Sequence, residues 1–209
     1  MPRVGLTTDR LVEAAAELAD EAGFENVSLS ALARRFGVKD ASLYSHVGSL
    51  RELRTRLALF VGAEMIDRIA AAVVGLAGKD ALAAFAGAYR DYALRHPGRY
   101  AATQIRIDRE LDRELTVDSP ALRRTGEITY GMLRGYGLDE PDLTDAVRLL
   151  RSTFHGYCLL EAGGGFGAPR DVRRSWDKAI DALHTALTHW PRESETDERP
   201  PDEHRATAG

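Results

Sequence analysis

Residues 28–47 decide the fold of this chain, and they read Ser28-Leu-Ser-Ala-Leu-Ala-Arg-Arg-Phe-Gly-Val-Lys-Asp-Ala-Ser-Leu-Tyr-Ser-His-Val47. The apolar residues of the first half recur at helical spacing and predict one short helix, which Gly37 ends. A second short helix is expected over residues 40–46 after a tight turn. Two short helices that cross steeply around a glycine-containing turn are typical of a helix-turn-helix unit.

The residues of this unit divide into an inner and an outer set. Ala33 is expected where the two helices approach each other closely, Val38 at the corner, and Leu43 and Val47 against the core. The other side of the second helix is short or polar, which suits a helix lying in the major groove of DNA. This predicted outer face consists of Lys39, Asp40, Ala41, Ser42, Tyr44, Ser45 and His46.

The local charge also favours DNA as a partner. The whole chain has a formal net charge of -4, yet residues 28–56 contain six basic and two acidic residues. A positive patch on an acidic protein is what attraction to phosphates requires. The alternative is a solvated helical bundle whose arginines face water, and charge alone would favour it. The glycine turn and the Leu-Tyr-x-His-Val ending at residues 43–47 favour DNA binding.

Residues 27–53 resemble the DNA-binding domain of TetR-family transcriptional repressors. The resemblance rests on Leu32-Ala-Arg-Arg-Phe-Gly-Val38 followed by Leu43-Tyr-Ser-His-Val47. It implies a homodimer, one recognition helix for each half-site, and a larger C-terminal helical domain that binds a small effector. It also implies that Tyr44 and His46 touch phosphate. The positions matching the groove-facing residues of the family are Lys39, Asp40, Ala41, Ser42 and Ser45.

The chain departs from the family pattern just after this stretch. Family members commonly have Lys where this chain has Leu50, so Arg51 is the candidate to replace that phosphate contact. Ser28, which opens the first helix, and Arg34, in the basic patch, complete the predicted DNA-binding set.

The remainder of the chain is predicted to be helical as well. A long helix is expected from Ser49 to the glycines near residue 75, and the further helices are expected at 80–96, 98–111, 120–136, 141–162 and 172–189. We therefore predict an all-α fold with a helix-turn-helix domain over residues 1–52 and a helical effector-binding and dimerisation domain over 53–190. Residues 191–209, with six acidic residues and three prolines, are expected to form a disordered acidic tail.

The C-terminal two-thirds offers candidates for a dimer interface and an effector site. The segment 141–162 is apolar on two faces, and the segment 172–189 adds Trp176, Ile180, Leu183 and Leu187. Together they predict a two-fold four-helix interface, unless one chain satisfies both faces itself. Polar or adaptable residues on apolar faces predict the effector cavity, although each of them can instead be a packing residue. These candidates are Tyr92, Gln104, Met132, Phe154, His155 and Cys158. Phe154-His155-Gly156 also resembles the Trp-His-Gly signature of one TetR subfamily.

Other classes of function find no support in the sequence. The chain has no apolar run long enough to cross a bilayer, no secretory signal pattern and a single cysteine, Cys158. We therefore expect a soluble cytoplasmic protein with no membrane partner. No catalytic motif, cofactor motif or four-ligand metal cluster is present. The carboxylates Asp108, Glu110, Asp112 and Glu114 alternate with arginines and are expected to form a solvated ion-pair surface.

The sequence thus predicts a homodimeric transcription factor, most simply a repressor that a small molecule releases from a palindromic double-stranded operator. The alternative is an all-α small-molecule-binding or enzymatic protein that has lost DNA binding, and Leu50 is the residue that favours it.

Overall fold

The computed structural model describes residues 6–108 and 110–191, so the predicted acidic tail, apart from its first residue, lies outside the described residues. Every regular element in these two ranges is a helix, and no strand occurs in them. The all-α prediction is confirmed. None of the helices in the described ranges combines the length and the apolar character that a bilayer crossing requires.

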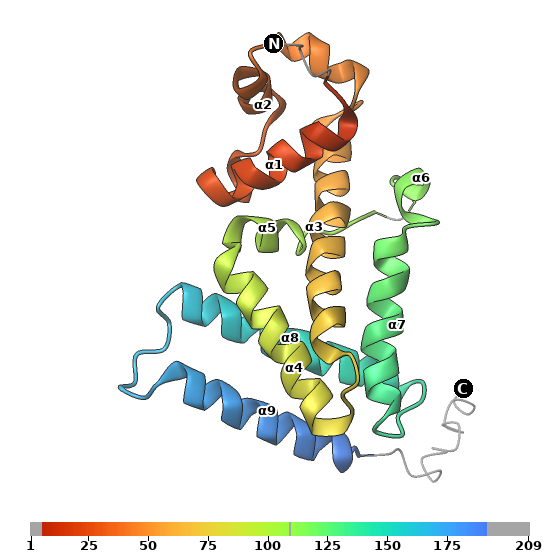
Figure 1. The fold of residues 1–209 in the computed structure, drawn as a ribbon, viewed down its shortest axis with the longest axis vertical. Coiled ribbons are helices and arrows are strands. Elements are labelled where there is room, and N and C mark those ends of the chain that lie inside the picture. The colour runs from red at the N-terminus through yellow and green to blue at the C-terminus, as the bar shows by residue number, and fades with distance from the viewer. Residues whose placement is uncertain (1–5, 109, 192–209) are drawn as a thin grey trace, which may run out of the picture.

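The N-terminal part is a small helical unit mounted on the first half of a long helix (Figure 1). It contains α1 (Thr8–Ala22), η1 (Phe24–Asn26), α2 (Leu29–Phe36) and η2 (Asp40–Ser45), followed by α3 (Leu50–Val73). The side-chain hydroxyls of Thr7, Ser28 and Ser49 cap α1, α2 and α3 by accepting a backbone N–H from the first turn. These caps fix where each helix begins.

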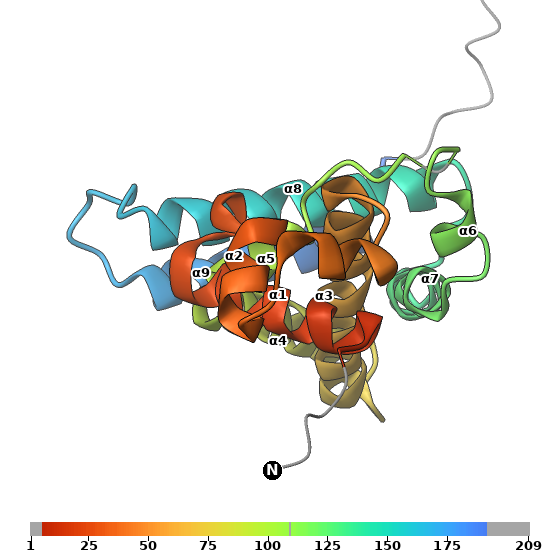
Figure 2. The ribbon, with the colours of Figure 1, turned by 90° about the horizontal axis from the view of Figure 1, so that it is seen from above.

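The remaining helices surround the second half of α3. They are α4 (Gly78–Arg95), α5 (Pro97–Ala102), α6 (Arg113–Thr116), α7 (Pro120–Arg134), α8 (Asp142–Ala162) and α9 (Val172–Thr188). Seen from above, α6 and α7 stand on one side of α3, while the α8–α9 hairpin extends to the opposite side (Figure 2). A short segment, α5, packs against α1 and connects the two parts.

The helix α3 serves two separate hydrophobic clusters. Leu53, Leu57 and Val61 belong to the N-terminal cluster, together with residues of α1 and α2. Met65, Ile66 and Ile69 belong to the cluster formed with α4, α8 and α9. The predicted domain boundary after residue 52 falls inside this helix, so the two parts of the molecule share one continuous rod.

Three local predictions need correction. The helix expected at 98–111 ends at Ala102, and the described residues between α5 and α6, 103–108 and 110–112, lie in a loop in which the half-buried side chains of Ile105 and Ile107 alternate with polar ones. The segment predicted as a helix at 40–46 is a 3-10 helix from Asp40 to Ser45. Val38, expected to fill the corner, is 38% exposed and lies outside the N-terminal core cluster, to which the buried Leu43 and Val47 belong.

The apolar face of α9 was predicted to form part of a dimer interface, but the structure places it elsewhere. Trp176, Ile180, Leu183 and Leu187 are buried in the C-terminal core of their own chain rather than presented to a second one. The helix packs against α4 and α8, which take up this face.

Candidate functional site

The turn between α2 and η2 presents a short 3-10 helix on the surface. Gly37 adopts a left-handed conformation (φ 65°, ψ 34°), which a residue without a Cβ reaches at little cost. The N–H of Val38 then donates to the carbonyl of Ala33 at 3.0 Å, closing the end of α2. On the far side, the hydroxyl of Thr8 donates to the carbonyl of His46 at 2.9 Å and ties η2 to α1.

The structure brings most predicted DNA-binding residues to this surface. Tyr44 stands out among them, because its large aromatic side chain is 57% exposed. Ser28 and His46 are half-buried, and the hydroxyl of Ser28 is occupied as the cap of α2. The exposed members of the set are Arg34, Lys39, Asp40, Ala41, Ser42, Tyr44, Ser45 and Arg51.

The basic patch is smaller than the sequence suggested, because intramolecular contacts take up most of its cations. Arg35 pairs with Glu17 at 2.6 Å and with Glu21 at 2.7 Å. Arg54 donates to backbone carbonyls, and Arg56 pairs with Glu52 at 2.8 Å. Within the described part of the chain, the two cations of the patch whose side chains form no ion pair and no hydrogen bond are those of Arg34 and Lys39.

Arg51 contacts a carboxylate instead of being free for phosphate. Its Nη1 forms an ion pair with Oδ1 of Asp112, which lies in the loop between α5 and α6. Asp112 is 5% exposed, so the prediction that its carboxylate is solvated is wrong. A buried carboxylate requires a partner, and Arg51 supplies it. The predicted phosphate contact of Arg51 stays a prediction, and it competes with this pair.

A close contact between backbones joins α1 to α5. A Cβ built at Gly98 would overlap the carbonyl oxygen of Ala19, so only glycine fits here. Around it, Asp20 of α1 accepts the backbone N–H of Arg99 at 3.0 Å and pairs with the Arg99 guanidinium at 2.9 Å. Arg99 also reaches Glu64 of α3 at 2.8 Å, so this one arginine bridges α1, α3 and α5.

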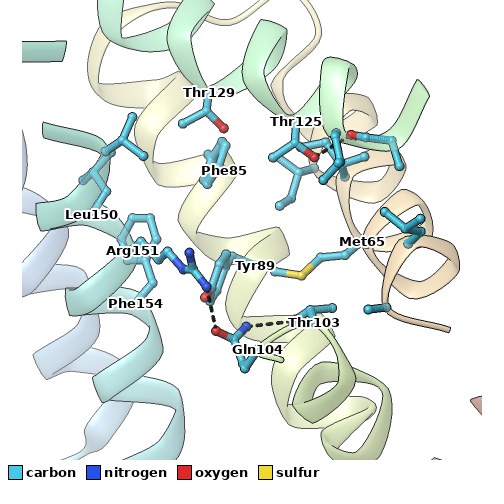
Figure 3. Close-up of a pocket in the computed structure, with 18 of the residues that line it drawn as sticks. Met65, Phe85, Tyr89, Thr103, Gln104, Thr125, Thr129, Leu150, Arg151 and Phe154 are labelled. Carbon is cyan, nitrogen blue, oxygen red and sulfur yellow. Dashed lines mark hydrogen bonds between the residues drawn. The ribbon is translucent and has the colours of Figure 1, made fainter. Parts of the chain in front are cut away.

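The C-terminal part contains a cavity of about 340 Å³ between α3, α4, α7 and α8. Its walls are mainly apolar, with Met65, Phe85 and Phe154 among the larger side chains (Figure 3). Apolar walls with a few placed polar groups are typical of ligand sites. The polar side chains lining this cavity are those of Tyr89, Thr103, Gln104, Thr125, Thr129 and Arg151.

A smaller cavity of about 200 Å³ lies next to the first, and Gln104 lines both. A chain of hydrogen bonds connects them: the hydroxyls of Tyr89 and Tyr100 are 2.7 Å apart, and that of Tyr100 lies 2.7 Å from Nδ1 of His155. Burial raises the pKa of both tyrosines. Burial, with a smaller contribution from the charge of Arg151, lowers the pKa of His155. Burial also raises the pKa of the Cys158 thiol to about 11.

The predicted effector residues separate into four groups by the cavity that they line. Phe154 lines the larger cavity, Gln104 lines both, and His155 and Cys158 line the smaller one. Tyr92 and Met132 are placed differently from the prediction, since they are among the lining residues of neither. The ring of Tyr92 is 1% exposed. Its hydroxyl lies 3.2 Å from the carboxylate of Glu64, which it reaches across the core.

Metal binding has no candidate in the described ranges, where no three His, Cys, Asp or Glu side chains lie close enough to share an ion.

Comparison with known proteins assigns the chain to a family. Residues 11–57 match the bacterial regulatory proteins of the tetR family, and residues 82–183 match the tetracyclin repressor-like C-terminal domain. The chain is 33% identical over 186 residues to the uncharacterized HTH-type transcriptional regulator YobS of Bacillus subtilis (strain 168), covering 89% of this chain and 95% of YobS. The protein belongs to the TetR family. It is therefore a DNA-binding transcriptional regulator rather than an enzyme.

Further relatives of this TetR-family chain agree with the assignment. The HTH-type transcriptional repressor DrrR1 of Streptomyces coeruleorubidus is 30% identical over 155 residues, covering 71% of this chain and 51% of DrrR1. The crystal structure of Mycobacterium smegmatis BioQ has a TM-score of 0.67 at 20% identity, covering 88% of this chain and 99% of that one. Apo ActR of Streptomyces coelicolor has a TM-score of 0.68 at 18% identity, covering 89% and 98%. The two structures share the fold.

Sequence reasoning missed several residues of the larger cavity. Thr125, Thr129 and Arg151 lie on helical faces that carry other polar residues, so each resembled a solvent-facing position. A cavity wall built by four helices leaves no spacing signal within any one of them. The subfamily suggested by Phe154-His155-Gly156 stays a prediction.

Proposed function

We propose that the protein is a homodimeric repressor that leaves a palindromic operator when a small-molecule effector occupies the larger cavity. One observation carries the proposal. The loop of residues 103–112 begins in the cavity wall with Thr103, Gln104 and Ile107, and it ends at Asp112, the partner of Arg51. A single stretch of ten residues thus runs from the ligand cavity to the edge of the DNA-binding surface.

The DNA-binding role divides between phosphate contacts and base contacts. We assign Tyr44 and His46, with Arg34, to phosphates, and the shorter side chains of Ala41, Ser42 and Ser45 to the groove together with Lys39 and Asp40. The exposure of η2 supports this assignment. So does the structure of BioQ with its double-stranded DNA operator, which matches this chain with a TM-score of 0.64 at 20% identity. In this proposal residues 1–52 form the DNA-binding domain and 53–190 the regulatory one.

The dimer would form through the outer faces of α8 and α9. Leu159 and Leu160 of α8 are 53% and 50% exposed, although apolar side chains of this size favour burial. A Cβ at Gly156, one turn earlier, would meet open space. Along α9 the exposed Ala182 and Ala186 offer a flat surface beside them. Two such helices from each subunit form a four-helix interface around a two-fold axis.

Release follows from a difference in affinity between two states of the dimer. Two recognition elements in successive major grooves must stand about 34–36 Å apart. An effector that binds better to a dimer with another spacing shifts the population away from the operator-binding state. ActR, whose structure in complex with (S)-DNPA shares the fold at 19% identity, supports the presence of a ligand site in this scaffold.

Selection of bound duplexes from a random pool tests the proposal directly. We expect palindromic half-sites and an affinity that falls steeply with salt. Tyr44→Phe should weaken binding to selected and random duplexes alike, by about tenfold for one phosphate hydrogen bond. Ser42→Ala should instead alter the preference among sequences. Equal losses for both variants would contradict the assignment of roles. Failure to recover any duplex would favour the alternative of a ligand-binding protein without DNA binding.

A further inference from the structure

We propose that the larger cavity selects organic anions, in which one carboxylate or sulfonate is attached to a compact apolar body. The proposal rests on the proposed function in treating this cavity as the effector site, and it names the chemical class of the effector. It follows from the charge of the cavity wall, from the groups that hold that charge in place, and from the apolar surface opposite.

The cavity wall carries one kind of charge. Arg151 is the charged side chain among the lining residues, and no Asp, Glu or Lys accompanies it in the described part of the wall. A cationic ligand would therefore find no counter-ion here. An anionic group would find a guanidinium, which binds carboxylates and sulfonates through two parallel N–H donors.

Two carboxylates of α8 are engaged by other arginines. Asp145, nearly two turns before Arg151, pairs with Arg148 at 2.9 Å. Glu161 is held by Arg90 of α4 through two hydrogen bonds. In the described ranges Arg151 forms no ion pair, and its side chain contacts the neutral amide of Gln104. This exposed arginine therefore lines the cavity with a positive charge that no carboxylate pairs with in these ranges.

Gln104 orients the guanidinium without neutralising it. The Nη2 of Arg151 donates to Oε1 of Gln104 at 3.4 Å, while Nε2 of Gln104 donates to the hydroxyl of Thr103 at 2.7 Å. Figure 3 shows Arg151 and Gln104 pointing toward each other beside the Tyr89 ring. The contact from Arg151 to Gln104 is long and therefore weak, so an anionic group of a ligand can replace Gln104 as the partner of the guanidinium.

The rest of the wall limits the ligand to one charge and a compact body. Met65, Phe85, Leu150 and Phe154 form an apolar surface with no second cation. His155, which lines the smaller cavity, has a lowered pKa because of burial and the charge of Arg151, so it adds no positive charge at neutral pH. A volume of about 340 Å³ lies at the small end of ligand cavities.

A matched pair of fluorescent probes distinguishes the contribution of the ligand's charge to binding from that of apolar burial. Anilinonaphthalene sulfonate and phenylnaphthylamine share the same ring system, and only the first carries an anion. We expect the full-length protein to bind both. Arg151→Gln should weaken binding of the sulfonate by about tenfold or more, as expected for loss of a charge-assisted hydrogen bond. It should leave the affinity for phenylnaphthylamine within about twofold, because apolar burial is unchanged.

Two control variants locate the effect. Arg148→Gln removes an arginine one turn away that is paired with Asp145 and is absent from the cavity lining, so neither affinity should change. Gly62→Leu places a side chain at a lining position where a Cβ would meet open space, so both probes should bind more weakly. Added salt should weaken binding of the sulfonate and leave the affinity for the neutral probe unchanged.

The outcomes distinguish this inference from the proposed function. Equal weakening of both probes by Arg151→Gln, or sulfonate binding that Gly62→Leu leaves intact, would overturn the anion site even if operator binding is normal. Arg151-dependent sulfonate binding supports the anion site. If that bound sulfonate then leaves the affinity for a selected operator duplex unchanged, the anion site stands and effector-controlled release fails.

Discussion

At the N-terminal end of α3, the guanidinium of Arg51 forms an ion pair with Asp112, directly after Leu50, the position where the family pattern has a lysine. The side chain of Arg51 is 53% exposed and that of Asp112 is 4% exposed, so the pair lies at the surface with one buried member. The same cation can serve Asp112 or a phosphate, and operator binding on this account requires it to change partner.

Replacement of Asp112 by asparagine should therefore strengthen DNA binding. Asp112→Asn keeps the shape of the side chain and removes the charge that holds Arg51. We expect operator affinity to rise by roughly three- to tenfold, and the slope of log affinity against log salt to steepen by about 0.9, the increment for one added phosphate contact. Quantitative band shifts at several salt concentrations measure both.

The double variant Asp112→Asn/Arg51→Gln serves as the control, since it should lose the gained affinity. A weaker operator complex for Asp112→Asn alone would mean that the pair positions α3 for DNA and is kept in the complex.

His155 gives the cavity region a dependence on pH. Its pKa is lowered by burial and by Arg151, so the folded state binds fewer protons than the unfolded state below the ordinary histidine value of about 6.5. The stability associated with neutral His155 is present above that value and is lost as the pH falls through the lowered pKa. Melting temperatures measured between pH 7.5 and 5 should fall less in His155→Gln than in the unaltered protein. Arg151→Gln should give an intermediate fall, and identical pH profiles for all three proteins would rule this explanation out.

At the scale of elements, most helix ends could be predicted from the sequence, because the residues that begin or end a helix act locally. Ser28, Ser49 and Pro120 begin helices and Gly37 ends one, each by its own backbone or side-chain chemistry. The loop of residues 103–112 escaped prediction, because what ends α5 is tertiary. Ile107 lines the larger cavity and Asp112 pairs with Arg51, so contacts with distant helices override the helical preference of the segment.

The contact between α5 and α1 should be intolerant of a single methyl group. Gly98→Ala places a Cβ into the carbonyl of Ala19, which belongs to helix backbone and cannot move aside. We expect a loss of about 1–3 kcal/mol in the free energy of unfolding, as for overpacked cores, measured by urea denaturation. Gly87→Ala is the matched control, because its Cβ would meet nothing within 4 Å in the middle of α4. It should stabilise the protein by about 0.5–1 kcal/mol. Similar effects of the two substitutions would mean that α1 and α5 do not depend on this close approach.

At the scale of the whole molecule, the outer face of α8 tests the dimer. Leu160→Glu introduces a charge where the proposed interface would bury it, so we expect the dimer dissociation constant to rise by at least about 100-fold. Sedimentation of the variant should show monomers, and binding to a palindromic duplex should weaken with it. Leu76→Glu changes another leucine that is 45% exposed, on the connection between α3 and α4, and should leave the dimer intact. A monomeric unaltered protein would contradict the interface altogether.

The composition of the cavity could be foreseen only in part. Gln104 and Phe154 were found because a polar or aromatic residue interrupted an otherwise regular pattern, and both line the larger cavity. Arg151 was not found, because an arginine on a helix face is usually solvated. What distinguishes Arg151 is its contact with the neutral side chain of Gln104, which depends on how the loop after α5 meets α8 in space.

The continuity of α3 through both hydrophobic clusters makes it a lever. Its 24 residues span about 36 Å at 1.5 Å per residue, with cavity-lining residues in its middle and second half and η2 next to its first turn. From Met65 in the cavity wall to the first turn is about 20 Å, so a tilt of about 5° around the cavity would carry that turn through about 2 Å. In the proposed two-fold dimer both helices would tilt, so the distance between the two DNA-binding elements would change by about 4 Å out of the 34–36 Å that one duplex turn demands. A small tilt beside a bound molecule would thereby change the distance between the two DNA-binding elements by about the rise of one base pair.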